Sequence, residues 1–138
     1  MDRSAQAGDM ASRLRSVAGL DVDAGLAFVG NNVEVYTRLL ARFVQLHEQD
    51  VSEILRQAQC ADLSAVQHMA HSIKGGAATL GLTALASRAQ QIEQAARDDG
   101  PHERLPELAA AMQTDYATLS RHLAKAAARK QAGSEAEP

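Results

Sequence analysis

The sequence predicts an all-α fold, an antiparallel up-down four-helix bundle with a short extra N-terminal helix. Apolar side chains recur at three- and four-residue steps in four successive segments. The chain has only 3 prolines, is rich in alanine, and shows no alternation of apolar and polar residues that would mark strands. Four amphipathic helices with short connections bury their apolar stripes best in an antiparallel bundle.

The 138 residues suffice for one domain with a sizeable core but not for two. Residues 1–18 are polar and lack a clear period, so we expect a flexible N-terminal segment. The bundle itself is expected over residues 19–128. Residues 129–138 are charged and rich in small residues, which predicts a disordered tail.

Each expected helix is separated from the next by a recognisable break. Residues 19–29 form the short amphipathic piece, after which Asn31 or Asn32 can cap the first long helix. Asp62 begins the second, Gly81 separates it from the third, and residues 98–101 form a turn before the fourth. The apolar stripes are, in order, Tyr36, Leu40, Phe43, His47, Val51 and Ile54; Val66, Met69, Ala70, Ile73, Ala77 and Leu80; Leu82, Leu85, Ala89, Ile92 and Ala96; and Leu105, Leu108, Met112, Tyr116, Leu119 and Leu123.

Composition excludes several classes of function. The net charge of −3 and the absence of a basic stripe with interleaved aromatic residues argue against nucleic acid binding. No apolar span or signal peptide is visible, and neither charged end is dense enough to indicate membrane contact. The single Cys60 cannot form an internal disulfide. We therefore expect a cytoplasmic protein.

His71 is the most informative residue, because the helical period places it opposite the apolar stripe of its own helix. The imidazole is therefore expected in solvent on a helix surface of mostly small or polar residues, with Lys74 one turn further along. The expected neighbours on this partner-facing surface are Ser64, Gln67, His68, Gly75 and Ala78. Such a surface suits a nucleophile that another protein must approach closely.

A neutral imidazole can attack a phosphoryl group only if one ring nitrogen is free while the other holds the proton. Glu93, at the edge of the next helix's stripe, is our choice for the group that accepts this proton's hydrogen bond, with Gln90 nearby as the alternative. Lys74 could neutralise phosphoryl oxygens as a point charge, assisted by Arg97.

The pair Gly75–Gly76 within a helix costs about 1 kcal/mol per glycine relative to alanine. At Gly75 the missing side chain gives a partner close access. At Gly76, nearer the core, packing between helices is the simpler explanation.

The segment 70–77 resembles the signature of histidine-containing phosphotransfer (HPt) domains, with the pattern His-x-x-Lys-Gly followed by Gly81. The resemblance extends from about residue 20 to 126. It implies that His71 is the phosphoacceptor, that Lys74 and Gly75 adjoin the phosphoryl site, and that Glu93 occupies the position of a Gln or Glu bonded to the histidine. Arg97 matches a less regular basic position of the family.

The resemblance further implies a monomeric phosphorelay carrier whose partners are response-regulator receiver domains and a hybrid sensor histidine kinase. The carrier could be a free-standing protein or the cytosolic end of a membrane-anchored hybrid kinase. His71 would take a phosphoryl group from one receiver aspartate and pass it to another. No cofactor of its own is expected: Mg²⁺ would belong to the receiver, and no glycine-rich nucleotide loop is present for ATP-dependent kinase activity.

Other interpretations remain open from sequence alone. The bundle could be a docking module of HPt type that binds a receiver or kinase without phosphotransfer. A dimerising phosphoacceptor domain of a sensor kinase fits poorly, because Ser72 and Ile73 replace the acid expected after the histidine. His68 and His71 would need further ligands to bind zinc, and His47 is expected to be a partly buried packing residue. His102 and His122 are expected in a loop and on a helix surface.

Overall fold

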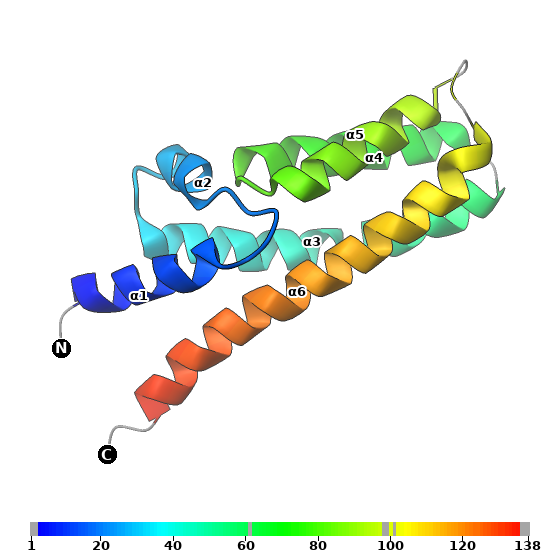
Figure 1. Ribbon diagram of the computed structural model, residues 1–138. Helices are drawn as coiled ribbons and strands as arrows, with labels where there is room; N and C mark the ends of the chain where they lie inside the picture. Colours follow the sequence, from blue (N-terminus) through cyan, green and yellow to red (C-terminus); the bar gives the residue numbers. More distant parts are fainter. Residues whose placement is uncertain (1–2, 61, 98–99, 101, 136–138) are drawn as a thin grey trace.

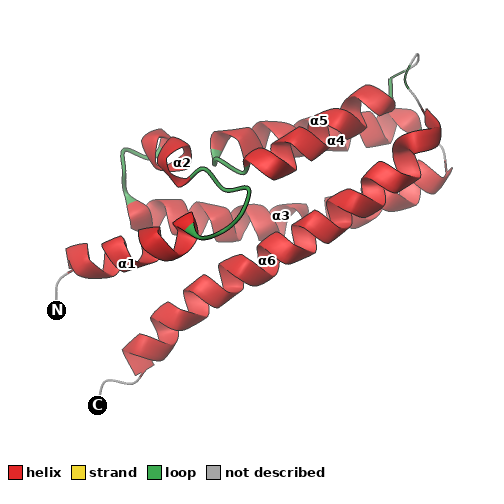
Figure 2. Ribbon diagram, viewed as in Figure 1, coloured by secondary structure: helices red, strands yellow, loops and turns green. Residues whose placement is uncertain are grey.

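The computed structural model describes residues 3–60, 62–97, 100 and 102–135, and it describes side chains within 8–59, 62–97, 100 and 102–126. Its elements are α1 (Arg3–Arg15), α2 (Val22–Phe28), α3 (Val33–Cys60), α4 (Leu63–Thr79), α5 (Thr83–Ala95), a single 3₁₀ turn (His102–Arg104) and α6 (Leu105–Glu135). No strand occurs in this described part of the chain (Figure 2). The predicted all-α class is confirmed.

Helices α3 to α6 form the bundle. α4 and α5 pack against each other as a hairpin, α3 packs against α4, and α6 closes the ring against α3 and α5 (Figure 1). Short connections reverse the chain between successive helices, so neighbours run antiparallel.

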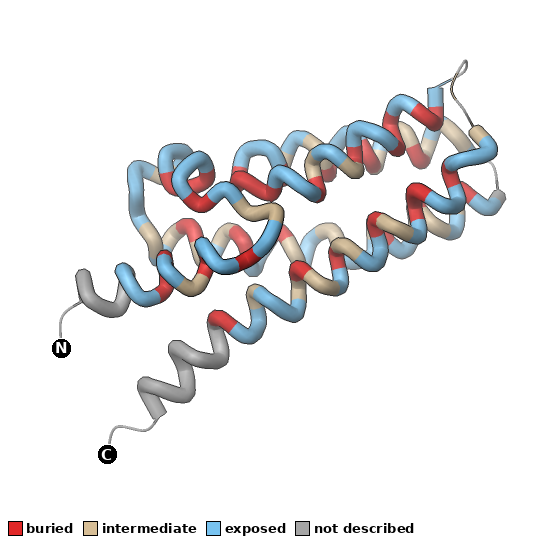
Figure 3. Tube along the Cα trace, viewed as in Figure 1, coloured by how far each residue is buried: buried red, intermediate tan, exposed pale blue. Residues whose placement is uncertain are grey.

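The core is built from the apolar stripes, which appear as inward-facing buried positions along each helix (Figure 3). Tyr36, Ile54, Ile73, Ile92 and Met112 are completely buried. Leucine, alanine, valine, isoleucine and methionine make up most of this core, as the scarcity of aromatic residues predicts.

Three helices begin at side chains that cap the free amide groups of the first turn. The side-chain oxygens of Asp21, Asn32 and Asp62 accept hydrogen bonds from amides three residues ahead, at 3.1, 3.1 and 3.2 Å. Such a cap contributes about 1 kcal/mol. Of the two candidate caps for α3, Asn32 is the one used, while Asn31 occupies the preceding turn with a φ of 65°.

The expectation of a flexible segment over residues 1–18 is wrong where α1 packs. Met10, Leu14 and Val17 are 2%, 1% and 7% exposed and join the same core as the bundle. Met10 and Leu14, four residues apart, lie on one face of α1, which packs against α3 and α6, and Val17 follows in the turn after the helix. The N-terminal part thus carries two extra helices rather than one.

The expected disordered tail also begins too early, since α6 continues to Glu135. The last three residues of that tail, 136–138, lie outside the described residues. Within the described chain, none of the helices combines the length and apolar character needed to cross a lipid bilayer.

The turn between α4 and α5 is held by Tyr36 in the first turn of α3 and by Asp21, which caps α2. The Tyr36 hydroxyl donates to the Leu80 carbonyl at 2.6 Å, and the Asp21 amide donates to the Gly81 carbonyl at 2.7 Å. Gly81 has a φ of +79°, and a Cβ there would lie 2.1 Å from the Asp21 carbonyl oxygen, so only glycine fits. Burial raises the pKa of Tyr36 to about 12, which keeps the hydroxyl a donor. This contact fixes one end of the α4–α5 hairpin.

Candidate functional site

His71 lies on the outer face of α4, and its side chain is 70% exposed. Ala70 and Ile73, beside it in sequence, are completely buried in the core. The period of the helix therefore turns the imidazole into solvent, where the sequence places it.

Glu93 lies on α5 against His71 and is only 5% exposed, the single buried charged residue among the described side chains. One carboxylate oxygen, Oε2, lies 2.6 Å from His71 Nδ1. The other, Oε1, accepts a hydrogen bond from Lys74 Nζ at 2.7 Å. His71 and Lys74 are three residues apart on α4, so both reach the same position on the antiparallel helix.

Glu93 is ionised at neutral pH despite its burial. The hydrogen bond from Lys74 is the largest influence and lowers the pKa of the carboxyl; burial opposes it, and the bond with His71 lowers the pKa further. The net direction is downward from the ordinary value of 4.5.

An ionised carboxylate can only accept hydrogen bonds, so Nδ1 of His71 must carry the proton in this contact. In a neutral ring the lone pair then belongs to Nε2, on the edge of the imidazole away from Glu93. The arrangement presents an unprotonated ring nitrogen to solvent from a fixed position.

The two adjacent glycines have different surroundings. A Cβ at Gly75 would meet nothing within 4 Å, whereas a Cβ at Gly76 would lie 2.9 Å from Cε2 of Phe43. Gly75 thus leaves open space one turn after His71. The missing side chain at Gly76 lets the Phe43 ring of α3 pack closely against α4, in agreement with the prediction that this glycine serves helix packing.

The expected partner-facing surface is partly assembled around the imidazole. Ser64, Gln67 and His68 line a shallow depression together with His71 and Glu93. Ala78 is exposed on the same helix. Ser64, Gln67, His68 and Glu93 border the ring without covering it.

Gln90 and Arg97 do not join the cluster. Both are exposed, and neither side chain forms a hydrogen bond or ion pair with His71, Lys74 or Glu93 in the described structure. Arg97 follows the end of α5. Of the two candidate acceptors, Glu93 therefore contacts the histidine.

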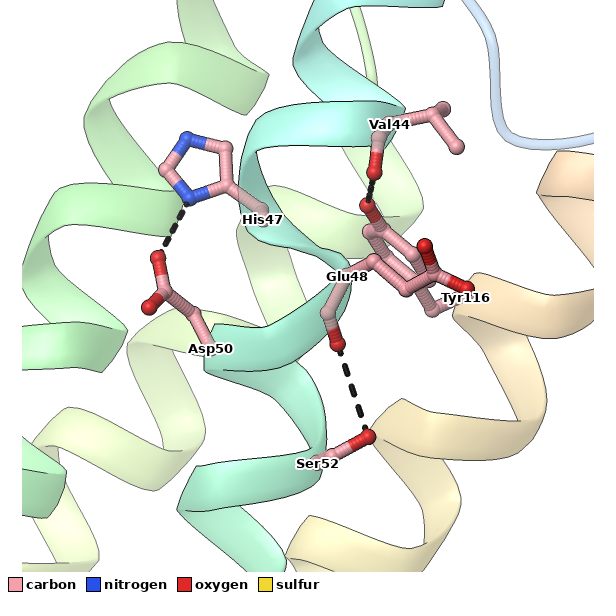
Figure 4. Close-up of polar contacts among 6 residues, drawn as sticks. All are labelled: Val44, His47, Glu48, Asp50, Ser52 and Tyr116. Atoms are coloured by element: carbon pink, nitrogen blue, oxygen red, sulfur yellow. Dashed lines mark hydrogen bonds and ion pairs between the residues drawn. The ribbon is translucent and has the colours of Figure 1, made fainter.

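The remaining histidines lie in other surroundings. His47 on α3 is largely buried, and its Nδ1 lies 3.0 Å from Asp50 Oδ2 (Figure 4). Its ring centroid lies 4.6 Å from that of Phe43. His102 lies in the 3₁₀ turn, with its ring bonded to the Arg97 carbonyl, and His122 is exposed on α6. No group of three or more metal-binding side chains gathers in the part of the chain that the structure describes.

The ion pair between Lys74 and Glu93 was missed by the sequence reasoning, which assigned Lys74 to phosphoryl oxygens alone. The spacing of His71 and Lys74 could have indicated this ion pair, since residues three apart on one helix can share a partner on the next helix.

In a comparison with known protein families, the Hpt domain model matches residues 38–122. This range covers α4 and α5 with the whole His71–Glu93–Lys74 cluster, most of α3, and α6 as far as His122. Neither the curated proteins nor the solved structures contain a match to the chain.

Proposed function

Because the chain belongs to the Hpt domain family, the histidine phosphotransfer domains of phosphorelays, we propose that it carries a phosphoryl group between receiver domains on His71. Nε2 of His71 takes the group from a receiver's aspartyl phosphate and later gives it to an aspartate of a second receiver. One observation carries the proposal: the exposed imidazole is bonded through Nδ1 to a buried carboxylate, which leaves Nε2 free.

The transfer balances without an added proton donor. The Nε2 lone pair forms a bond to phosphorus while the bond from phosphorus to the aspartyl oxygen breaks, and the carboxylate leaves with its electron pair. The ring gains positive charge as Nε2 becomes bonded. The Nδ1–H bond to ionised Glu93 stabilises that charge from the start, so little reorganisation is needed.

The surroundings of His71 also suit this partner. The transition state of phosphoryl transfer is loose, so positioning and electrostatics dominate catalysis. Open space at Gly75 allows a receiver's aspartyl phosphate to approach the ring. In this proposal any Mg²⁺ is bound by the receiver.

The test is incubation with a phosphorylated receiver domain. We expect this protein to acquire an acid-labile, alkali-stable phosphate, and His71→Gln to abolish the label with almost unchanged helicity and melting. His122→Gln, an exposed histidine on α6, is the matched control and should label normally. Labelling of the His71 variant would contradict the proposal, and receiver binding with no phosphate accepted would favour a docking module instead.

A further inference from the structure

Two adjoining depressions lie on the side of the bundle where α6 packs against α1 and α5. The smaller one, between α1 and α6, has a volume of about 210 Å³. The larger one, mainly between α5 and α6, has a volume of about 470 Å³. His122 lines both, so the two depressions meet along α6. No residue of α4 lines either of them, and they are therefore separate from the site around His71.

The smaller depression gathers positive charge. Arg13 and Lys125 line it together with the imidazole of His122, and none of the residues that line it is acidic. Neither cation forms an ion pair in the described part of the chain. The Nε of Arg13 is buried without a hydrogen-bond partner, and leaving such a group unpaired is costly. An anion held against the guanidinium would offset this cost.

The end of α1 borders the same depression, and free carbonyls at the C-terminus of a helix repel anions. Here these carbonyls are engaged within the chain. The Arg13 carbonyl accepts hydrogen bonds from the amide and the hydroxyl of Ser16, at 3.2 and 2.6 Å. The Leu14 carbonyl accepts one from the Val17 amide at 3.0 Å. The repulsion expected from the helix end is therefore reduced.

The acids closest in sequence to this cluster do not cancel its charge. Asp115 lines the larger depression, where its carboxylate accepts a hydrogen bond from Arg88 Nε at 3.1 Å. Asp9, one turn before Arg13 on α1, is exposed and does not line the smaller depression.

The larger depression offers an apolar wall. Buried side chains of Leu82, Leu85 and Leu119 form part of it. Polar groups at its border come from Ser87, Gln91 and Thr118. A largely apolar lining with a few polar groups, at this volume, is typical of sites that bind small molecules.

From this juxtaposition we propose that the two depressions form one binding site for a small phosphate monoester with an aromatic or aliphatic body. Arg13 and Lys125 bind the phosphate, and the body lies against the apolar wall. Near neutral pH a phosphate monoester carries close to two negative charges, which match the two cations. A carboxylate carries only one. Because the site shares no residue with the surface around His71, this ligand and a receiver can bind together.

The first test is a titration with phenyl phosphate, followed by the backbone amide signals in ¹⁵N NMR. The amides of Leu85, Leu119 and His122 should shift and saturate, with a Kd on the order of 1 mM for a ligand of this size. Inorganic phosphate lacks the apolar body, and benzyl alcohol lacks the charge. Each should bind on the order of tenfold more weakly. Equal binding of phenyl phosphate and inorganic phosphate, or no saturable shift of these amides, would overturn the inference.

Two substitutions test the cations separately. Lys125→Met changes an exposed side chain and should leave the fold intact, while Arg13→Met removes the guanidinium at the end of α1. Each should weaken the binding of phenyl phosphate on the order of tenfold, because a charge-assisted hydrogen bond is lost. Arg42→Met, an exposed cation of α3 that lines neither depression, is the matched control and should bind normally. Unchanged affinity in both test variants would overturn the inference.

Phenyl phosphate could also bind beside the imidazole of α4, so the same titration is repeated with His71→Gln and Lys74→Met. Both should bind with the affinity of the natural chain. Loss of binding in Lys74→Met, or shifts confined to amides around residue 71, would place the ligand at the phosphotransfer site and overturn the inference. No receiver is used in these titrations. Their outcome is therefore independent of whether the proposed function holds.

Discussion

Substituting the two adjacent glycines of α4 should produce opposite effects on stability. Glycine within a helix costs about 1 kcal/mol relative to alanine. A Cβ at Gly75 meets nothing within 4 Å. Gly75→Ala should therefore recover nearly the whole difference and raise the free energy of unfolding by about 1 kcal/mol, or the melting temperature by roughly 4 °C.

At Gly76 the same gain is opposed by a close contact. The new Cβ would lie 2.9 and 3.3 Å from two carbons of the Phe43 ring, which is itself packed against His47. Overpacking of this kind costs about 1–3 kcal/mol. Gly76→Ala should thus be neutral to destabilising, by up to about 2 kcal/mol once the helix gain of about 1 kcal/mol is subtracted.

Urea denaturation of both variants beside the natural chain measures these differences directly. Equal stabilisation by both substitutions would refute the reasoning, because it would mean that α3 does not approach α4 closely at Gly76. The functional counterpart uses a bulkier side chain: Gly75→Leu should slow phosphotransfer from a receiver while leaving the fold at least as stable.

Three further substitutions test other contacts. Leu14→Ala should lower the free energy of unfolding by about 2–4 kcal/mol, because it leaves a cavity in the core; no change would mean that α1 does not pack there. Tyr36→Phe removes the donor to the Leu80 carbonyl, and calorimetry should show a loss of about 1–2 kcal/mol; an unchanged melting temperature would contradict that bond. The pKa of Glu93 is lowered on folding, so its contribution is present above the unfolded value of 4.5 and is lost as pH falls through the lower folded value. The stability of the natural chain relative to Glu93→Gln should therefore decline on acidification below about pH 4.5, and a pH-independent difference in urea titrations would contradict the ionised state.

Helical periodicity was sufficient to place His71 and its neighbours. The apolar stripe of α4 identifies the buried side of the helix, and therefore also the solvent-facing side. His71 lies on that solvent-facing side, as the periodicity predicts. Because α5 runs antiparallel beside α4, one of its polar side chains was expected to reach His71. The choice between Glu93 and Gln90 depends on the rotation of α5 about its own axis, which periodicity fixes only to within a residue or two.

Other features depend on contacts between distant segments. Met10 and Leu14 mark the buried face of α1 in a largely polar segment, and Val17 follows just past the helix end, so the pattern was too sparse to predict a helix that packs. The bridge from Lys74 to Glu93 and the bond from Tyr36 to Leu80 join different helices at particular atoms. A one-dimensional pattern gives the face of each helix, but not the atoms that meet across the interface.

The central claim is that Nε2 of His71 is the reactive atom because Glu93 holds the proton on Nδ1. NMR of the receiver-phosphorylated protein, with ¹⁵N-labelled histidine and ³¹P detection, reports which ring nitrogen is bonded to phosphorus. The account predicts a single phosphohistidine at residue 71, substituted on Nε2. Phosphate on Nδ1 of His71, or on any other residue, would contradict it.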